Sequence, residues 1–429
     1  MDKERYLAAF KSFQTKVSLE PSWIGPIKKN AMSRFVEMGF PTQRDEEWKY
    51  TNVEPIAKEF FRFPFEVSLN GVTSEKIKPF FLDEKGTKLV FLTSQFRKDW
   101  SSISSSEIQA GSLKEVLVSH AKDLEPYLAK LADFQKNSFT ALNTAFFSDG
   151  AFLSIEKQKA VKEPIQLLFV SSAHEEKVTS QPRNLILVGE GAEATLVESH
   201  FSLSEEPYFT NTVTEIFLAP GAKLTRYLIQ MESPKAYHVE TTHVHQAKGS
   251  HFSSFVFSFG AKLSRNNLSV ALDSEGAGCE LEGLYMVSDH QHVDHHTLID
   301  HLKPYGTSRQ VYKGVLGGQA KAVFNGKILV RKDAQKTDAH QLNKNLLLSE
   351  NAVVDAKPQL EIFADDVKCT HGAAIGQLAD EEIFYVKSRG IGEEHARRLL
   401  TFGFAGEILE QVKLGSLRSR LENWVTSNL

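Results

Sequence analysis

The spacing of apolar positions changes twice along the chain. Over residues 1–60, apolar residues recur every three or four positions in "YLAAFKSF", "PIKKNAMSRFVEMG" and "EPIAKEFF", which predicts amphipathic helices. A mixed stretch follows, with a predicted strand at 87–95 and predicted helices at 112–131 and 133–147. We therefore assign residues 1–145 to an N-terminal helical or mixed domain.

From about residue 146 the pattern becomes one of short apolar runs separated by small turns. Runs such as "AFLSI", "PIQLLFV" and "HFSSFVFSFG" have the length and composition of strands, so residues 146–378 are predicted to form a strand-dominated domain. Similar turns recur at intervals of 30, 28, 27, 42 and 33 residues, at Gly191, Gly221, Gly249, Gly276, Gly318 and Asn351. Glycine or asparagine there would supply a positive φ. The same turns fit a barrel or sandwich, but the spacing favours the coils of a parallel β-helix.

Helical periodicity returns in the last part of the chain. Residues 379–429 contain three amphipathic segments, at 380–388, 393–412 and 416–425, and are predicted to form a C-terminal helical domain. The fold class is thus mainly β, with helices at both ends of the chain. We expect these helices to cover the open ends of the solenoid, where unpaired strand edges would otherwise be exposed.

Composition narrows the class of protein. Fifty basic and fifty-four acidic residues give a formal charge of −4, which favours neither nucleic acid nor an anionic membrane as a partner. No apolar stretch approaches the roughly 20 residues of a membrane span, and the first residues carry charges where a secretory signal is apolar. Two cysteines are too few for a disulfide framework and fit a reducing compartment, so we expect a cytoplasmic protein.

Common catalytic motifs have no counterpart in the sequence. There is no GxxxxGK[ST] phosphate-binding loop and no GxSxG nucleophile elbow, so neither an intrinsic ATPase nor a hydrolase of that class is supported.

Histidines gather in two segments, at 243–245 and 288–301. Alternating positions on a strand share a face, so pairs of them could bind a metal ion. The sequence shows no carboxylate or cysteine at a recognised metalloprotease spacing, and a polar outer face is the favoured interpretation. The residues concerned are His243, His245, His290, His292, His295, His296 and His301.

The two cysteines have different settings. Cys279 shares its strand face with Leu281, which predicts a buried, inert thiol. Cys369 stands two places before His371 in "DDVKCTHGAAIGQ", and an extended chain would put both side chains on one face, roughly 6–7 Å apart at Cα. The pair could bind iron or zinc, but such centres usually need about four protein ligands, so a second chain would have to supply the rest. A catalytic Cys–His pair or an ordinary strand end remains an open alternative.

Several segments resemble the SufB/SufD family of iron–sulfur cluster assembly proteins. They include "RDEEWKYTN", "RNNLSVALDSEGAGCELEGLY" and a long stretch beginning "HVDHHTLIDHLKPYG", and the similarity is strongest over about 240–405. The resemblance implies a right-handed parallel β-helix between helical terminal domains, with no catalytic activity. It implies pairing with a SufB paralogue and with the ABC-type ATPase SufC, which would dock on the tail at about 380–412.

The resemblance also assigns site residues. The family's "CTHG" element is intact, so Cys369 and His371 become candidate ligands of an iron–sulfur cluster or an iron atom. That centre would be transient and shared with SufB, with none expected in the isolated chain, which could form a homodimer when alone. Contact with the ATPase is implied for Tyr385, Arg389, Gly390, Ile391 and Phe404. Two alternatives stay open: a β-helix carbohydrate-active enzyme, and a purely structural partner of SufC.

Overall fold

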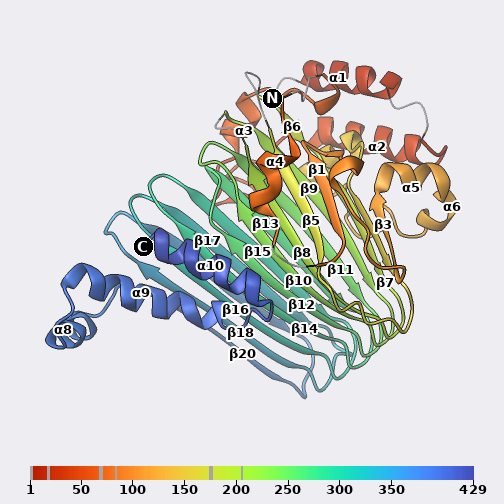
Figure 1. Cartoon of the computed structure of the whole chain (residues 1–429). Coiled ribbons are helices and arrows are strands. Elements are labelled where there is room, and N and C mark those ends of the chain that lie inside the picture. Colours follow the sequence, from red (N-terminus) through yellow and green to blue (C-terminus); the bar gives the residue numbers. More distant parts are fainter. Residues whose placement is uncertain (1–2, 17–19, 67–70, 83–84, 173–176, 204–205) are drawn as a thin grey trace.

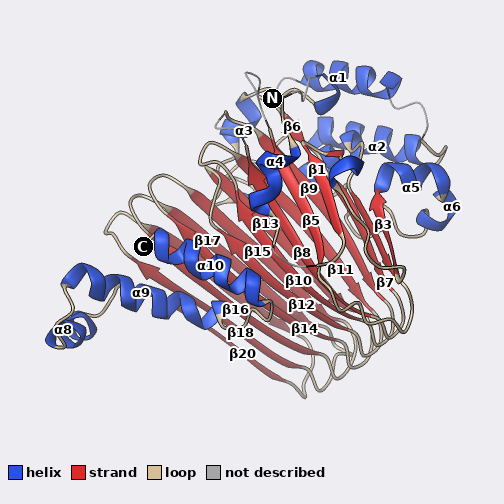
Figure 2. Ribbon diagram, in the orientation of Figure 1, coloured by secondary structure: helices blue, strands red, loops and turns tan. Residues whose placement is uncertain are grey.

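A computed structural model describes residues 3–16, 20–66, 71–82, 85–172, 177–203 and 206–429. Two long sheets lie face to face, and the chain alternates between them as it advances from one end of the molecule to the other (Figures 1 and 2). Successive strands of each sheet pair in parallel and in continuous register. The predicted parallel β-helix is confirmed.

We call the two sheets sheet 1 and sheet 2. In spatial order, sheet 1 contains β2 (Gln95–Phe96), β1 (Lys88–Leu92), β5 (Ile165–Ser171), β8 (Glu193–Ser202), β10 (Lys223–Met231), β12 (His251–Ser258), β14 (Gly278–Val287), β16 (Thr307–Leu316), β18 (Asp338–Leu347) and β20 (Lys368–Gly376). Sheet 2 contains β19 (Val353–Ile362), β17 (Lys321–Val330), β15 (His292–His301), β13 (Leu263–Leu272), β11 (Tyr237–Gln246), β9 (Phe209–Leu218), β7 (Arg183–Val188), β4 (Ala151–Ile155) and β3 (Ile108–Ser112), and β6 (Thr179–Ser180) pairs with β9. The pairs β1–β2 and β3–β4 are antiparallel.

The turns from sheet 2 to sheet 1 explain the repeat in the sequence. Gly191, Gly221, Gly249 and Gly276 occupy these turns with φ of 62°, 68°, 62° and 70°, in the region that favours glycine. The next two turns of the series carry Tyr305 and Lys336 at φ of 60° and 62°. The series therefore continues at intervals of 29 and 31 residues without glycine.

The last two positions of the sequence repeat belong to other turns than predicted. Gly318 has a positive φ of 60°, but it lies between β16 and β17, in the opposite series of turns. Asn351 lies between β18 and β19, also in that series, and is not among the residues with positive φ. The 42-residue interval in the sequence is therefore a change from one series of turns to the other.

Inward side chains of the two sheets form the main core. Because the parallel strands are in register, equivalent residues of successive turns lie next to one another. One such inward row across sheet 2 is aliphatic throughout and consists of Ile186, Ile216, Val244, Val270, Ile299, Ile328 and Leu360. Cys279 lies in the same core, close to Leu281, as predicted. Burial, and to a lesser degree Glu280, raises the pKa of the Cys279 thiol, which keeps it protonated.

Helices of the N-terminal part pack on the outer face of sheet 2. Phe13, Phe35 and Phe146 pack with Phe209 and Val239 of that face. The elements are α1 (Lys3–Lys16), α2 (Ile24–Met38), η1 (Glu46–Trp48), α3 (Glu54–Lys58), η2 (Pro64–Glu66), α4 (Ser74–Ile77), η3 (Lys78–Phe80), η4 (Lys98–Trp100), α5 (Leu113–Ser119), α6 (Ala121–Leu124) and α7 (Ser138–Phe146).

The division of the chain into domains 1–145, 146–378 and 379–429 stays a prediction. Strands β1, β2 and β3 precede residue 146 and still extend the two sheets. Parts of the proposed N-terminal domain, residues 1–2, 17–19, 67–70 and 83–84, lie outside the described residues. None of the described helices is long and apolar enough to cross a membrane.

The C-terminal helices occur where the sequence predicts them but pack elsewhere than expected. They are α8 (Asp380–Ser388), α9 (Glu393–Leu409) and α10 (Gly415–Ser427). Ile408 and Leu421 of α9 and α10 pack on Tyr227, Phe257 and other residues of the outer face of sheet 1 (Figure 1). The expectation that they cover the end of the solenoid is wrong, because their apolar faces bind the side of sheet 1. No further strand among the described residues pairs with the outer edges of β19 and β20.

Candidate functional site

Cys369 and His371 lie on β20, the last strand of sheet 1. The register places Cys369 opposite Ala339 and His371 opposite Gln341 on β18. Ala339 belongs to the solenoid core, so the two candidate ligands share the inward parity of the strand. Cys369 and His371 therefore face the interior of the last turn, where the solenoid is open, and Thr370 and Gly372 between and after them face outward.

The two side chains differ in exposure. Cys369 is half-buried against the core, whereas His371 is exposed. Burial and the carboxylate of Asp338 raise the pKa of the Cys369 thiol, and a hydrogen bond from the Ala339 backbone opposes them only in part. Nucleophilic attack and metal binding both use the thiolate, so the raised pKa favours neither role over the other.

The site is short of ligands. Among the described residues, Cys369 and His371 belong to no group of three or more histidine, cysteine or carboxylate ligands. His371 also borders a hollow of about 350 Å³, formed with residues of β16 and β18 that include Arg309 and His340. Arg309 and His340 have outward parity on their strands, so the hollow lies toward the outer face of sheet 1.

Most of the residues assigned to ATPase contact lie at the tip of the C-terminal tail. Tyr385, Arg389, Gly390 and Ile391 are exposed on α8 and the loop after it, and α8 projects away from the solenoid (Figure 1). Arg389 Nη2 lies 3.3 Å from Tyr385 Oη.

Phe404 has a different setting from the other tail residues. It is half-buried on α9, and Lys313 of β16 donates a hydrogen bond to its carbonyl oxygen at 3.0 Å. The sequence analysis missed two exposed apolar residues of the tail, Phe384 of α8 at 73% and Leu399 of α9 at 52% exposure. Helical periodicity could have found them, since both fall outside the buried stripe of their helices.

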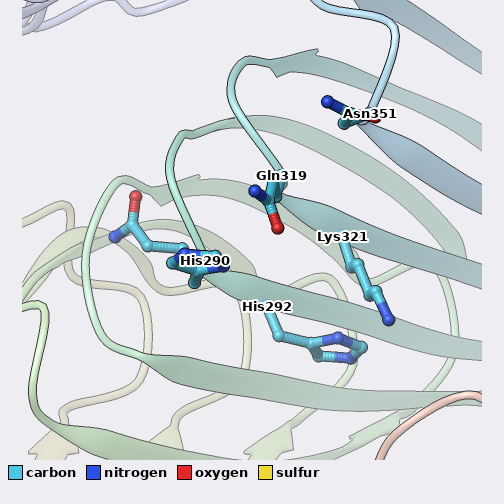
Figure 3. Close-up of a pocket in the computed structure, with 6 residues that line it drawn as sticks. His290, His292, Gln319, Lys321 and Asn351 are labelled. Carbon is cyan, nitrogen blue, oxygen red and sulfur yellow. The ribbon is translucent and has the colours of Figure 1, made fainter.

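The histidine-rich segments form no metal site of three ligands among the described residues. His290 and His292 line a pocket of about 520 Å³ together with Lys321, whose ammonium disfavours a cation there (Figure 3). The predicted polar outer face is wrong for His295 and His301, which are buried inside the solenoid. The cause is strand parity, because they share the inward face of β15 with Ile299.

A buried cluster was also missed. His200, His238 and Glu240 bring ligand atoms together inside the solenoid. The signal was available, because Glu198 and His200 share strand parity with the apolar Leu196 in "TLVESHF".

Comparison with known proteins identifies the family. The model described as "SUF system FeS cluster assembly, SufBD core domain" matches residues 169–404, and "SufBD protein N-terminal region" matches residues 1–167. The chain is 36% identical to an iron–sulfur cluster assembly SufBD family protein of Synechocystis, over 99% of this chain and 95% of that protein. It is 30% identical to the iron–sulfur cluster assembly protein SufD of Escherichia coli, over 92% and 91%. SufD of Bacillus subtilis is 25% identical over 96% and 95%.

The two family models together cover the N-terminal part, the solenoid, α8 and most of α9, and the match ends at residue 404. The relatives match over nearly their whole length, so the similarity concerns the entire architecture. This chain belongs to the SufBD family of iron–sulfur cluster assembly proteins.

Proposed function

We propose that this chain is a non-catalytic scaffold subunit that pairs with a SufB paralogue and binds the ATPase SufC. The observation that carries the proposal is the position of Cys369 and His371 on an uncovered edge strand, with fewer ligands among the described residues than an iron centre needs. The cluster, or an iron atom on its way into one, is the cargo of this complex. It forms at the interface between the two solenoids and is then passed on.

The uncovered edge supports pairing with a second solenoid. Lys368 donates its backbone N–H to Thr337 at 2.9 Å, so its N–H faces β18. Successive N–H groups alternate along a strand, and those of Cys369, His371 and Ala373 therefore face away from β18. Such an edge is a template for pairing with another chain. A paralogue bound here brings its own thiols and imidazoles next to Cys369 and His371, and a second copy of this chain uses the same edge when the paralogue is absent.

The tail supports contact with a further partner. Phe384 and Tyr385 of α8 and Leu399 of α9 are exposed apolar side chains, which is typical of surfaces that bind a partner. Neighbouring charges are paired within the tail, as in the ion pair of Lys387 with Glu393 at 2.8 Å. An ATPase docked on the tip of this tail could transmit its movements through α9, which packs on sheet 1.

Co-expression with the two partners tests the proposal. The complex is purified without oxygen, its absorption spectrum is recorded, and its iron and acid-labile sulfide are measured. We expect cluster absorption in the wild-type complex and loss of iron and sulfide in the Cys369→Ala complex. Equal iron and sulfide contents in both would make the chain a purely structural partner, and failure of the three proteins to co-purify would reject the partnership.

Replacing Ala373 by proline is expected to weaken binding of the paralogue about tenfold, because one main-chain donor on the free edge is lost and the proline ring crowds the approaching strand. The chain itself should stay folded, since proline is tolerated where the N–H of an edge strand faces solvent. Titration calorimetry measures the affinity. Ala374→Pro is the matched control, because its N–H faces β18 and its loss should lower the melting temperature. An unchanged affinity of Ala373→Pro would place the paralogue on another surface.

A further inference from the structure

Six charged or ionisable side chains meet inside the solenoid, between sheet 1 and sheet 2. They are Glu198 and His200 of β8, Arg226 of β10, Glu232 of the turn before β11, and His238 and Glu240 of β11, and none is more than 5% exposed. Ionised groups in such an interior are normally paired with one another or bound to a metal ion. This cluster is separate from Cys369 and His371, and its role is independent of the proposed function.

Three members of the cluster converge on one point. His200, His238 and Glu240 each offer a ligand atom, and these three atoms lie within 4.8 Å of one another. Glu240 is fully buried, and its Oε2 atom has no hydrogen-bond partner among the described residues, although it lies 3.6 Å from His238 Nε2. A buried carboxylate oxygen in this setting needs a proton, a water molecule or a cation beside it, and a cation would also bind the two imidazoles.

The remaining members hold these ligands in the way that metal-binding histidines are held. His238 Nδ1 lies 2.6 Å from Glu232 Oε2, and His200 Nε2 lies 3.2 Å from Glu198 Oε1. Each imidazole thus has a carboxylate on one nitrogen. Such outer carboxylates fix the ring orientation and raise the basicity of the other nitrogen.

Arg226 orders the carboxylates in turn. Its Nε and Nη2 atoms donate to Glu198 Oε2 at 3.0 and 2.7 Å, and Nη2 also donates to Glu240 Oε1. With both imidazoles neutral, the carboxylates of Glu198, Glu232 and Glu240 exceed the one guanidinium by two negative charges. A divalent cation balances this excess.

We propose that His200, His238 and Glu240 bind a divalent transition-metal ion, of which zinc is the best match, inside the solenoid. Imidazole and carboxylate ligands suit zinc, which binds them at about 2.0–2.2 Å, so modest side-chain rotations close the set around the ion. A fourth position remains for water or Glu198. The ion has a structural role, because it ties β8 of sheet 1 to β11 of sheet 2, and its enclosed position means that it is acquired as the chain folds.

The competing state is an ion network without metal. Burial disfavours a charged imidazole, but Glu232 and Glu240 outweigh it and raise the pKa of His238 to about 10. In this state the imidazole of His238 carries a second proton between Glu232 and Glu240, and its positive charge takes the place of the metal ion. Metal content separates the two states directly.

The test uses the full-length chain, free of any tag, purified from cells grown with added zinc and, separately, with added cobalt. Elemental analysis is expected to find one zinc per chain, and the cobalt protein is expected to show the visible absorption of a tetrahedral site. Glu240→Gln should reduce the metal content at least tenfold. Two control variants should keep the metal. His301→Asn replaces another buried histidine, which shares a hydrogen bond with Ser308. His371→Ala replaces the candidate iron ligand on β20, away from the cluster.

Three outcomes overturn the proposal. The wild-type protein contains no metal after either growth, the metal is retained in both Glu240→Gln and His200→Asn, or His301→Asn loses as much metal as Glu240→Gln. The first rests on folded wild-type protein alone, so a variant that fails to fold does not remove the test. Iron and sulfide in the complex with the partners report on the proposed function separately, since that site lies at β20.

Discussion

Replacing His371 with alanine is expected to lower the iron and sulfide content of the proposed complex at least about tenfold, because it removes a proposed ligand from a set that is incomplete among the described residues. The partners should still bind. His371 is exposed and contributes little packing, so the stability of the chain should change by no more than about 0.5 kcal/mol. Iron and sulfide analysis of the anaerobically purified complex measures the effect, and size-exclusion chromatography checks assembly.

His340→Ala is the matched control for this change. His340 is also exposed, one strand away on β18, but it has the opposite strand parity, and its ring contacts Thr370 and Asp338. Its loss should leave iron and sulfide unchanged. His371→Cys should keep more iron than His371→Ala, since a thiolate can replace the imidazole as a ligand. If His371→Ala disrupts assembly instead, the residue is structural; if iron is unaffected, it is no ligand.

The fold could be predicted largely from strand-length apolar runs and turn glycines. The predicted series of turn positions was wrong where Tyr305 and Lys336 adopt a positive φ. Residues other than glycine also adopt this conformation when the adjacent coils hold the turn. The helices of the tail were found from their periodicity, but the surface they cover was not. An amphipathic pattern shows that a face of α9 is buried, without showing whether it packs on the side or on the end of the solenoid.

The candidate site was predicted in part for similar reasons. Cys369 and His371 are two residues apart, so strand geometry alone places them on one face. The buried cluster joins His200 and His238, which are far apart in the chain and meet only because β8 and β11 face each other across the core. Inward parity indicates that each is buried, and the registered coils then decide which residues become neighbours.

The register of the coils also brings together a buried ion pair on the outer face of sheet 2. This pair joins the N-terminal part to the solenoid. Arg183 of β7 donates from Nη2 to Glu215 Oε2 of β9 at 2.6 Å, and neither residue is exposed. Glu215 also accepts backbone N–H groups at 2.7–3.0 Å, from Ala129, Leu131 and Ala132. Burial alone would raise the pKa of Glu215, but the charge of Arg183 and these donors hold it below its usual value.

Replacing Arg183 with methionine is therefore expected to cost about 3–5 kcal/mol of unfolding free energy, because Glu215 stays buried without its counter-charge. Urea unfolding at pH 7 measures the loss, and Arg183→Met combined with Glu215→Gln should recover part of it.

In the wild type the depressed pKa of Glu215 stabilises the fold above the pKa of glutamate in unfolded chains, about 4.3, and this contribution fades as pH falls through the pKa of the folded state. In the variant the unpaired carboxyl has a raised pKa, so protonation relieves its cost. The difference between the two proteins should thus start to narrow above about pH 4.3, as pH falls through the raised pKa of Glu215 in the variant, and should narrow further below it. A difference that stays constant with pH would show that lost packing, rather than the buried charge, sets the stability of this junction.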